Sequence, residues 1–160
     1  MSTPQMTTPE KLAFKGSLYD FAHSILSDRI LHAQEAMVSA QEAANEEGKS
    51  SVGDKYEVSR AMGQIDTEMN ARQLEEANKD IVHLQSVDVN QVYGHVRDGT
   101  VVVTDTQTFF ISIGLGIQKV NGKEIVFISL TSPLGRAFDG QRKLDKVKFN
   151  TKVYQVREIF

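Results

Sequence analysis

Apolar residues recur at helical spacing along most of the first half of the chain. From Leu18 to Glu47 they follow one another mostly in steps of three and four, without Gly or Pro, which predicts an amphipathic helix. The positions are Leu18, Ala22, Ile25, Leu26, Ile30, Ala33, Met37, Ala40 and Ala44. A second run, Glu57 to Leu84, is interrupted only by Gly63, with apolar positions at Val58, Met62, Ile65, Met69, Leu74, Ala77, Ile81 and Leu84. Two long helices joined by a few Ser and Gly residues predict an antiparallel α-helical hairpin, or coiled coil, over residues 1–85.

The ends of the two helices carry recognisable signals. Either Thr8–Pro9 or Ser17 could begin the first helix, and Ser51 is suited to cap the second. The apolar register of the second helix slips between Met69 and Leu74. This slip predicts weak packing in the middle of the hairpin.

The sequence period changes to two from Val87 onward, where β-branched and aromatic runs alternate with turn residues. Asp98–Gly99 and Asn121–Gly122 are dipeptides typical of hairpin turns, and Gly114–Gly116 is expected to form a bulge or loop. The expected strands are Val101–Val103, Thr108–Ile113, Ile125–Ser129, Lys146–Phe149 and Val153–Ile159.

One short helix is expected among these strands. Ser132 would be its N-cap, Pro133 its first helical residue and Gly140 the residue that ends it. Residues 86–160 are therefore predicted to form a small antiparallel β-sheet domain with one short helix. The whole chain is predicted to be α+β, with a boundary between 1–85 and 86–160.

Composition narrows the possible functions. The chain has 160 residues and no cysteine, which excludes disulfides, thiolate metal sites and a cysteine nucleophile, and fits a reducing cytoplasm. It has no apolar run long enough for a transmembrane helix, so no membrane association is expected. Residues 1–85 hold eight Lys/Arg and fourteen Asp/Glu, whereas residues 86–160 hold ten and seven. Neither half is basic enough to predict a nucleic-acid-binding groove by itself.

No self-contained active site is visible in the sequence. The four histidines show no metal-ligand spacing, and no Gly-x-Ser-x-Gly nucleophile motif is present. The chain is therefore not expected to be an enzyme or to take a small-molecule substrate.

The candidate chemistry lies at the hairpin tip. Asp54 and Glu57 are three residues apart, which puts them on one face of the first turn of the second helix. Such carboxylates can complete a Mg²⁺ site in another protein. They can also simply cap the helix and complement its dipole.

Two motifs of the chain resemble those of the bacterial Gre transcript-cleavage factors. The tip carries Gly53, Asp54 and Glu57 as Gly–Asp–x–x–Glu, and the short helix carries Ser–Pro–Leu–Gly–Arg–Ala over residues 132–137. The resemblance covers nearly the whole chain, and the second motif is the more specific one. It implies an FKBP-like C-terminal domain and an N-terminal hairpin that enters the secondary channel of RNA polymerase.

The resemblance also implies roles for particular residues. Asp54 and Glu57 would hold a Mg²⁺ ion shared with RNA polymerase and promote the polymerase's own hydrolysis of backtracked RNA. The protein would have no cofactor in isolation, and would reach nucleic acid only through the elongation complex. The polymerase-binding residues would be Ser132, Pro133, Leu134, Gly135 and Arg136.

Two alternatives remain open at this point. Lys55 places a cation between the two tip acids, which is compatible with a secondary-channel regulator that binds RNA polymerase without promoting cleavage. The hairpin could also serve as the arm of a coiled-coil adaptor or chaperone-like interaction protein.

Overall fold

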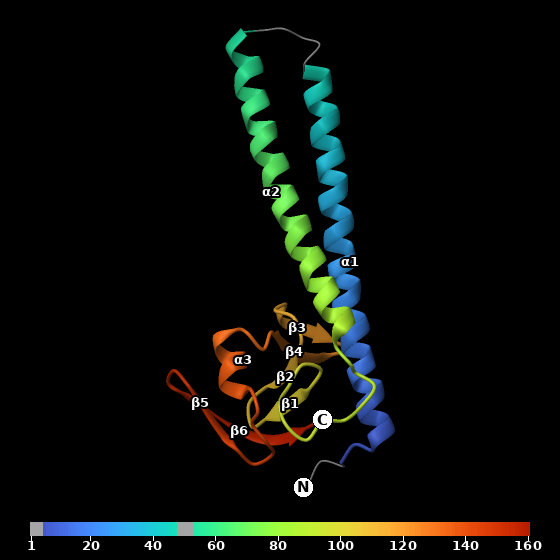
Figure 1. Cartoon of the computed structure of the whole chain (residues 1–160), viewed down its shortest axis with the longest axis vertical. Helices are drawn as coiled ribbons and strands as arrows, with labels where there is room; N and C mark the ends of the chain where they lie inside the picture. The colour runs from blue at the N-terminus through green and yellow to red at the C-terminus, as the bar shows by residue number, and fades with distance from the viewer. Residues whose placement is uncertain (1–4, 48–52) are drawn as a thin grey trace. The chain divides into compact units, whose positions relative to one another are not determined.

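The computed structural model describes residues 5–47 and 53–160, with side chains described outside the range 47–60. Two long helices, α1 (Thr8–Glu47) and α2 (Gly53–Ser86), come first, and a mixed sheet with one short helix follows (Figure 1). The predicted α+β class is therefore confirmed. The other elements are β1 (Val101–Thr104), β2 (Thr108–Ile111), β3 (Gly116–Val120), β4 (Lys123–Ile128), α3 (Pro133–Phe138), β5 (Lys146–Phe149) and β6 (Lys152–Ile159). No helix in this described part of the chain is long and apolar enough to cross a membrane.

The chain divides into two compact units. One combines Met1–His23 with His83–Phe160, and the other is Ser24–Val82. The expected boundary at residue 85 thus falls beside the end of α2, whereas the first part of α1, up to His23, groups with the sheet. Side-chain packing explains this grouping, because Leu18 is fully buried and Phe21 stacks on Phe127 of β4 with ring centroids 5.8 Å apart.

Helix α1 begins at the earlier of its two expected start sites. Thr7 caps it: the Thr7 Oγ1 accepts a hydrogen bond from the Glu10 backbone N–H at 3.3 Å and donates one to Glu10 Oε1 at 2.9 Å. Thr7 thus satisfies one free N–H of the first turn and also holds the Glu10 side chain. Ser17 lies inside the helix, where its hydroxyl donates to the Phe14 carbonyl, so it does not begin a helix. Ser51 lies outside the described residues.

The sheet has the strand order β3-β4-β2-β1-β6-β5. Four of its neighbouring pairs are antiparallel, but β2 and β4 are parallel. The expectation of an antiparallel sheet is therefore wrong for this pair. The chain reverses through residues 112–115 and again at Asn121–Gly122, so β4 returns in the direction of β2 and is inserted between β2 and β3.

The expected turns have different outcomes. Asn121 and Gly122 both have positive φ, 50° and 82°, and form the β3–β4 hairpin turn as predicted. Asp98–Gly99 also forms a turn, with φ +90° at Gly99, but it leads into β1 from a segment without strand structure. It is therefore not a hairpin turn. Strand β3 itself was not among the expected strands.

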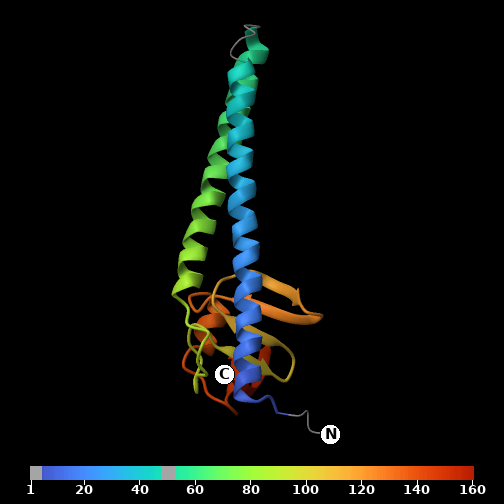
Figure 2. The same ribbon diagram turned by 90° about the vertical axis from the view of Figure 1, so that its right-hand side faces the viewer.

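Both faces of the sheet are covered, which explains why its central strands are continuously apolar. The short helix α3 packs on one face through Phe138, whose ring lies 5.0 Å from that of Phe109 and 5.5 Å from that of Tyr154. Residues 8–23 of α1 cover the other face, where Phe14 contacts Phe160 and Phe21 contacts Phe127 (Figure 2).

In the Ser24–Val82 unit, α1 and α2 run side by side and antiparallel, as predicted (Figures 1 and 2). On α1 the expected apolar stripe is buried at Leu26 and Ala33. On α2 the stripe is buried at Ala77. Its distal part, however, is more than half exposed at Met62, Ile65 and Met69. The assignment of these three residues to the helix interface is therefore wrong.

The spacing of the residues that do face inward explains this correction. Counting back from Leu84 in alternating steps of three and four gives Ile81, Ala77, Leu74, Asn70, Thr67 and Gly63, all buried or partly buried. The inner face of α2 keeps one register throughout, and at its distal end that register selects small and polar residues. The large apolar residues Met62, Ile65 and Met69 lie beside this inner face.

Candidate functional site

Helix α3 is built by the residues of the Ser–Pro–Leu–Gly–Arg–Ala motif. Ser132 has extended backbone angles and its Oγ accepts a hydrogen bond from the Gly135 N–H at 3.1 Å, so it is the N-cap as predicted. The same hydroxyl donates to the Ser129 carbonyl at 2.7 Å, which ties the start of the helix to the end of β4. Pro133 occupies the first turn, where a missing N–H costs nothing.

Gly135 is required by a close backbone approach. A Cβ atom at this position would lie 1.9 Å from the Ser129 carbonyl oxygen, far inside any van der Waals contact. Since the obstructing atom belongs to the backbone, it cannot rotate away. Only glycine therefore lets α3 pack this closely against the chain that leaves β4.

The five predicted polymerase-binding residues divide into two groups. Ser132 caps the helix, Gly135 provides the close approach and Leu134 packs against the hydrophobic core, so these three build the fold. Pro133 and Arg136 are exposed and remain available for a partner.

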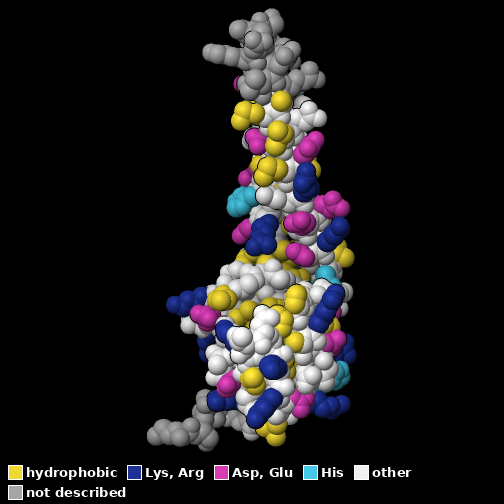
Figure 3. Space-filling model, turned by 90° about the vertical axis from the view of Figure 1, so that its left-hand side faces the viewer, with side chains coloured by type: hydrophobic (Ala, Val, Ile, Leu, Met, Phe, Trp, Pro, Cys, Tyr) yellow, Lys and Arg dark blue, Asp and Glu magenta, His cyan; other side chains and the backbone are white. Residues whose placement is uncertain are grey.

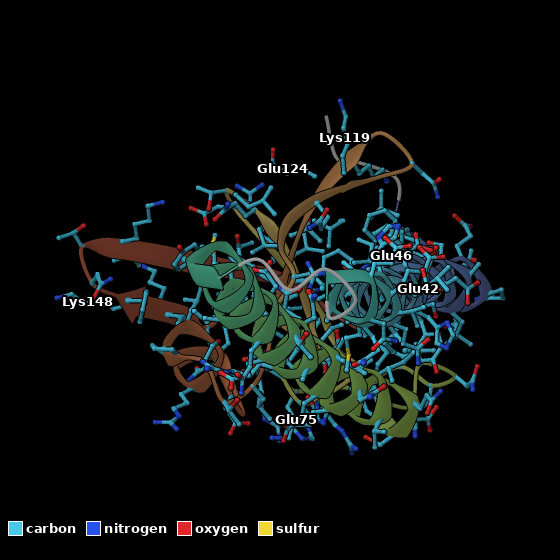
Figure 4. The ribbon with its side chains drawn as sticks, turned by 90° about the horizontal axis from the view of Figure 1, so that it is seen from above. Glu42, Glu46, Glu75, Lys119, Glu124 and Lys148 are labelled. Atoms are coloured by element: carbon cyan, nitrogen blue, oxygen red, sulfur yellow. The ribbon has the colours of Figure 1, made fainter. Side chains whose placement is uncertain are left out.

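The turn that follows α3 adds exposed cations to this surface. Arg142 and Lys143 are both exposed, and the Arg142 backbone N–H donates to Asp145 Oδ2 at 2.7 Å, which closes the turn. Farther along, Lys148 projects from the edge strand β5 (Figure 4). We refer to Pro133, Arg136, Arg142 and Lys143 as the α3 patch; its charge suits an acidic partner surface.

Leu144, within the same turn, is a feature that the sequence did not indicate. It is a non-glycine residue in the left-handed region, with φ 77°, and its side chain is 72% exposed. Its backbone is held by two hydrogen bonds: its N–H donates to the Val156 carbonyl, and its carbonyl accepts from the Gln155 side chain. These hydrogen bonds hold Leu144 in the left-handed conformation, while most of its side chain stays exposed.

The tip residues stand at the start of α2. The backbone is helical from Gly53, so Asp54 and Glu57 share one face of its first turns by their spacing. Their side chains, and those of Lys55 and Val58, lie outside the described side chains. Two carboxylates form a donor set that Mg²⁺ accepts, usually together with waters or phosphate oxygens from elsewhere. Among the described residues, no group of three or more His, Cys, Asp or Glu is placed to hold a metal ion.

A buried lysine is the other feature that sequence reasoning missed. Lys15 is fully buried, and its Nζ donates to the Gln91 carbonyl at 2.7 Å and lies 4.5 Å from the centroid of the Tyr93 ring. Arg97 stands over the same ring at 4.4 Å. Burial lowers the pKa of Lys15 to about 8; the Asp88 carboxylate opposes this shift and Arg97 adds to it.

A signal for this site was present in the sequence. The apolar stripe of α1, extended back three residues from Leu18, reaches Lys15. A lysine in line with a buried stripe either extends its amine to the surface or finds partners inside. Lys15 does the second, and so links α1 to the segment 87–97.

Comparisons with known proteins add one structural likeness. No protein-family model matches the chain, and no curated protein matches it. Among solved structures, the chain is similar to one described as "Structure of the transcription factor Gfh1". The TM-score is 0.35 at 16% sequence identity, over 85% of this chain and 90% of that chain. At this TM-score, function has to be argued from the residues of the chain itself.

Proposed function

We propose that the protein is a Gre-like transcription elongation factor that binds RNA polymerase and promotes cleavage or rescue of backtracked transcripts. The observation that carries the proposal is the Ser–Pro–Leu–Gly–Arg–Ala motif, the most specific feature of the sequence. Three of its residues have distinct roles in the structure. Ser132 caps the helix, Gly135 permits the close backbone approach to Ser129, and Arg136 is an exposed cation. The same chain holds Gly–Asp–x–x–Glu at the start of α2, between two long helices.

The dimensions of the hairpin suit a narrow channel. Residues 24–47 of α1 and 53–82 of α2 belong to one unit, and at 1.5 Å per residue they extend roughly 36 and 45 Å. An arm of this length, one helix pair wide, could carry Asp54 and Glu57 to an active site deep inside a large enzyme. There the two carboxylates would hold a Mg²⁺ ion, which supplies charge stabilisation for the attacking water and the departing oxygen.

This role makes the protein an accessory factor. The catalytic centre would be that of RNA polymerase, and Asp54 and Glu57 would add ligands to it. The chain on its own should therefore cleave no RNA.

Docking of the sheet-containing unit is assigned to the α3 patch. Arg136 is exposed on α3, and Arg142 and Lys143 follow in the next turn. These cations would meet an acidic surface of RNA polymerase, which would orient the protein before the hairpin enters the channel.

Lys55 favours a second candidate function, a polymerase-binding regulator without cleavage activity. A lysine between Asp54 and Glu57 in sequence brings a positive charge close to the carboxylates that would hold Mg²⁺. If this charge neutralises the pair, the hairpin would occupy the channel without supplying a metal ligand set.

Binding to RNA polymerase tests the part that both candidates share. The full chain should co-elute with core RNA polymerase in size-exclusion chromatography at moderate salt. Arg136→Glu should weaken this association at least about tenfold, which corresponds to the loss of one charge-assisted contact. Lys119→Glu is the matched control, because it makes the same charge change on β3, at the opposite edge of the sheet from β5.

Two outcomes would count against the proposal. If no stoichiometric complex forms, the coiled-coil adaptor is favoured instead. If Arg136→Glu folds normally and binds as well as the parent, the α3 patch is not the docking surface.

A further inference from the structure

Three large apolar side chains on α2 are more than half exposed in the described part of the hairpin. Met62, Ile65 and Met69 are 62%, 56% and 52% exposed. Their spacing of three and four places them along one side of the helix. We call them the α2 stripe. Figure 3, which faces α2, shows hydrophobic side chains following one another along the arm, with acidic side chains on both sides.

The α2 stripe borders the seam between the two helices. Met62 directly precedes the inward-facing Gly63 in the chain, and Met69 directly precedes the inward-facing Asn70. Across the seam, the half-buried apolar residues of α1 at this level are Ala36, Met37 and Ala40, two of which are small. Large exposed side chains on α2 beside the small Ala36 and Ala40 of α1 form a surface into which a third helix can pack.

A groove continues from the stripe along the same flank of α2. Steps of four and seven from Met69 reach Gln73 and Glu76, and both line a cavity of about 530 Å³ between α1 and α2. Arg29, His32, Ala33 and Ala36 of α1 line its other side. The apolar stripe and this more polar groove together extend over several turns of the hairpin.

The negative charge of the Ser24–Val82 unit indicates what kind of partner could bind the α2 stripe. Residues 24–82 contain six Lys/Arg and twelve Asp/Glu, a formal charge of −6. Asp66 lies within the stripe's span and Glu76 lies beyond it, with Arg72 as a cation nearby. Glu42 and Glu46 of α1 and Glu75 of α2 extend outward from the arm (Figure 4). A second copy of the chain would bring another acidic hairpin against this one, which like-charge repulsion opposes.

We propose that the α2 stripe and its adjoining groove bind an amphipathic helix of another protein, with an apolar ridge and Lys or Arg on its flanks. The ridge would cover Met62, Ile65 and Met69, and the flanking cations would face the acidic residues of the arm. Methionines suit such a surface, because their flexible side chains adapt to different ridges. This contact uses neither the tip carboxylates nor the α3 patch, so it is tested separately from the proposed function, although a helix bound along the arm would keep the arm out of a narrow channel.

A designed peptide tests the proposal directly. The probe is a fluorescein-labelled helix of about 18 residues, roughly five turns, with Leu at i, i+3, i+4 and i+7 positions and Lys elsewhere. Its binding to the full chain is followed by fluorescence anisotropy at about 0.15 M salt. A second peptide, with Glu in place of every Lys, measures how much of the binding depends on charge.

The matched variants change exposed apolar residues on the two helices. Met62→Gln/Ile65→Gln/Met69→Gln should weaken binding of the Lys peptide at least about tenfold, since three apolar contacts are lost. Leu31→Gln/Val38→Gln should leave it unchanged. These two residues are 51% and 58% exposed, and their spacing from Ala33 puts them on the opposite side of α1. All five positions are exposed, so circular dichroism should show folded hairpins in both variants.

Several results would overturn the proposal. No binding of the Lys peptide to the parent chain, or equal binding to the two variants, would each do so. Equal binding of the Glu peptide would show adhesion without charge selection. Sedimentation of the parent as a dimer that the triple variant abolishes would show that a second copy is the occupant.

Discussion

The buried amine of Lys15 makes the stability of the protein depend on alkaline pH in a defined way. Its pKa in the folded chain is about 8, against 10.5 for the ordinary side chain, because burial disfavours the charged form. The unfolded chain therefore binds more protons at this site between pH 8 and 10.5. Stability must rise with pH across that window, since the folded state no longer has to keep a charge buried.

The size of the effect follows from the same two pKa values. At 1.36 kcal/mol per pKa unit, the full shift corresponds to about 3 kcal/mol, and most of it is recovered between pH 7 and pH 10. Lys15→Met removes the titrating group and keeps a flexible chain of similar length. The parent should therefore gain roughly 2–3 kcal/mol relative to Lys15→Met between these two pH values.

Urea unfolding of both proteins at pH 7, 8, 9 and 10 measures this quantity. Taking the difference between the two proteins cancels every other group that titrates in the same range. A difference in unfolding free energy that stays constant with pH would refute the argument, because it would mean that Lys15 keeps its proton in the folded state as readily as in water.

Two predictions concern backbone conformation in α3 and in the turn that follows it, with Gly63 of α2 as a control. Gly135→Ala should lower the unfolding free energy by at least about 2 kcal/mol, because the new Cβ meets the Ser129 carbonyl. Gly63→Ala, in an open position inside α2, should instead raise it by about 0.5–1 kcal/mol; equal effects at the two sites in urea unfolding would contradict this account. Leu144→Gly should stabilise the protein by about 0.5–1 kcal/mol, since it relieves a left-handed leucine and removes little buried surface. A lower midpoint of thermal unfolding for Leu144→Gly would show that the leucine contributes packing after all.

Local signals explain which parts of the fold could be predicted. The start and end of α3 follow from Ser132, Pro133 and Gly140, whose effects are confined to a few neighbouring residues. The turn at Asn121–Gly122 follows from the ease with which these two residues adopt positive φ. Capping and turn chemistry need no knowledge of the rest of the molecule.

The missed features depend on distant partners. Strand β3 lies at the edge of the sheet and is exposed over most of its length, so it has no strong apolar alternation. The parallel pairing of β2 with β4 depends on where the chain re-enters the sheet after β3, and no local sequence pattern indicates this position. On α2, side-chain character favoured Met62, Ile65 and Met69 as interface residues, but the position of α1 decides which face is buried.

The candidate site shows the same division. The sequence singled out the motif residues 132–136, but it could not separate Ser132, Leu134 and Gly135, which build the fold, from Pro133 and Arg136, which are exposed. That distinction rests on the Ser129 carbonyl and the core beneath α3. The roles of Asp54 and Glu57 rest on the sequence motif and on the helical backbone at the start of α2.

Transcript cleavage by stalled elongation complexes tests the central claim most directly. RNA polymerase halted in a backtracked position, with a labelled transcript and Mg²⁺, is incubated with the parent chain, with Asp54→Asn or with Glu57→Gln. The account predicts that the parent accelerates release of short 3′ fragments, that neither variant does so while both still bind the polymerase, and that the parent cleaves nothing without polymerase. Stimulation by the variants equal to that of the parent, or a bound parent that gives no stimulation, would contradict it.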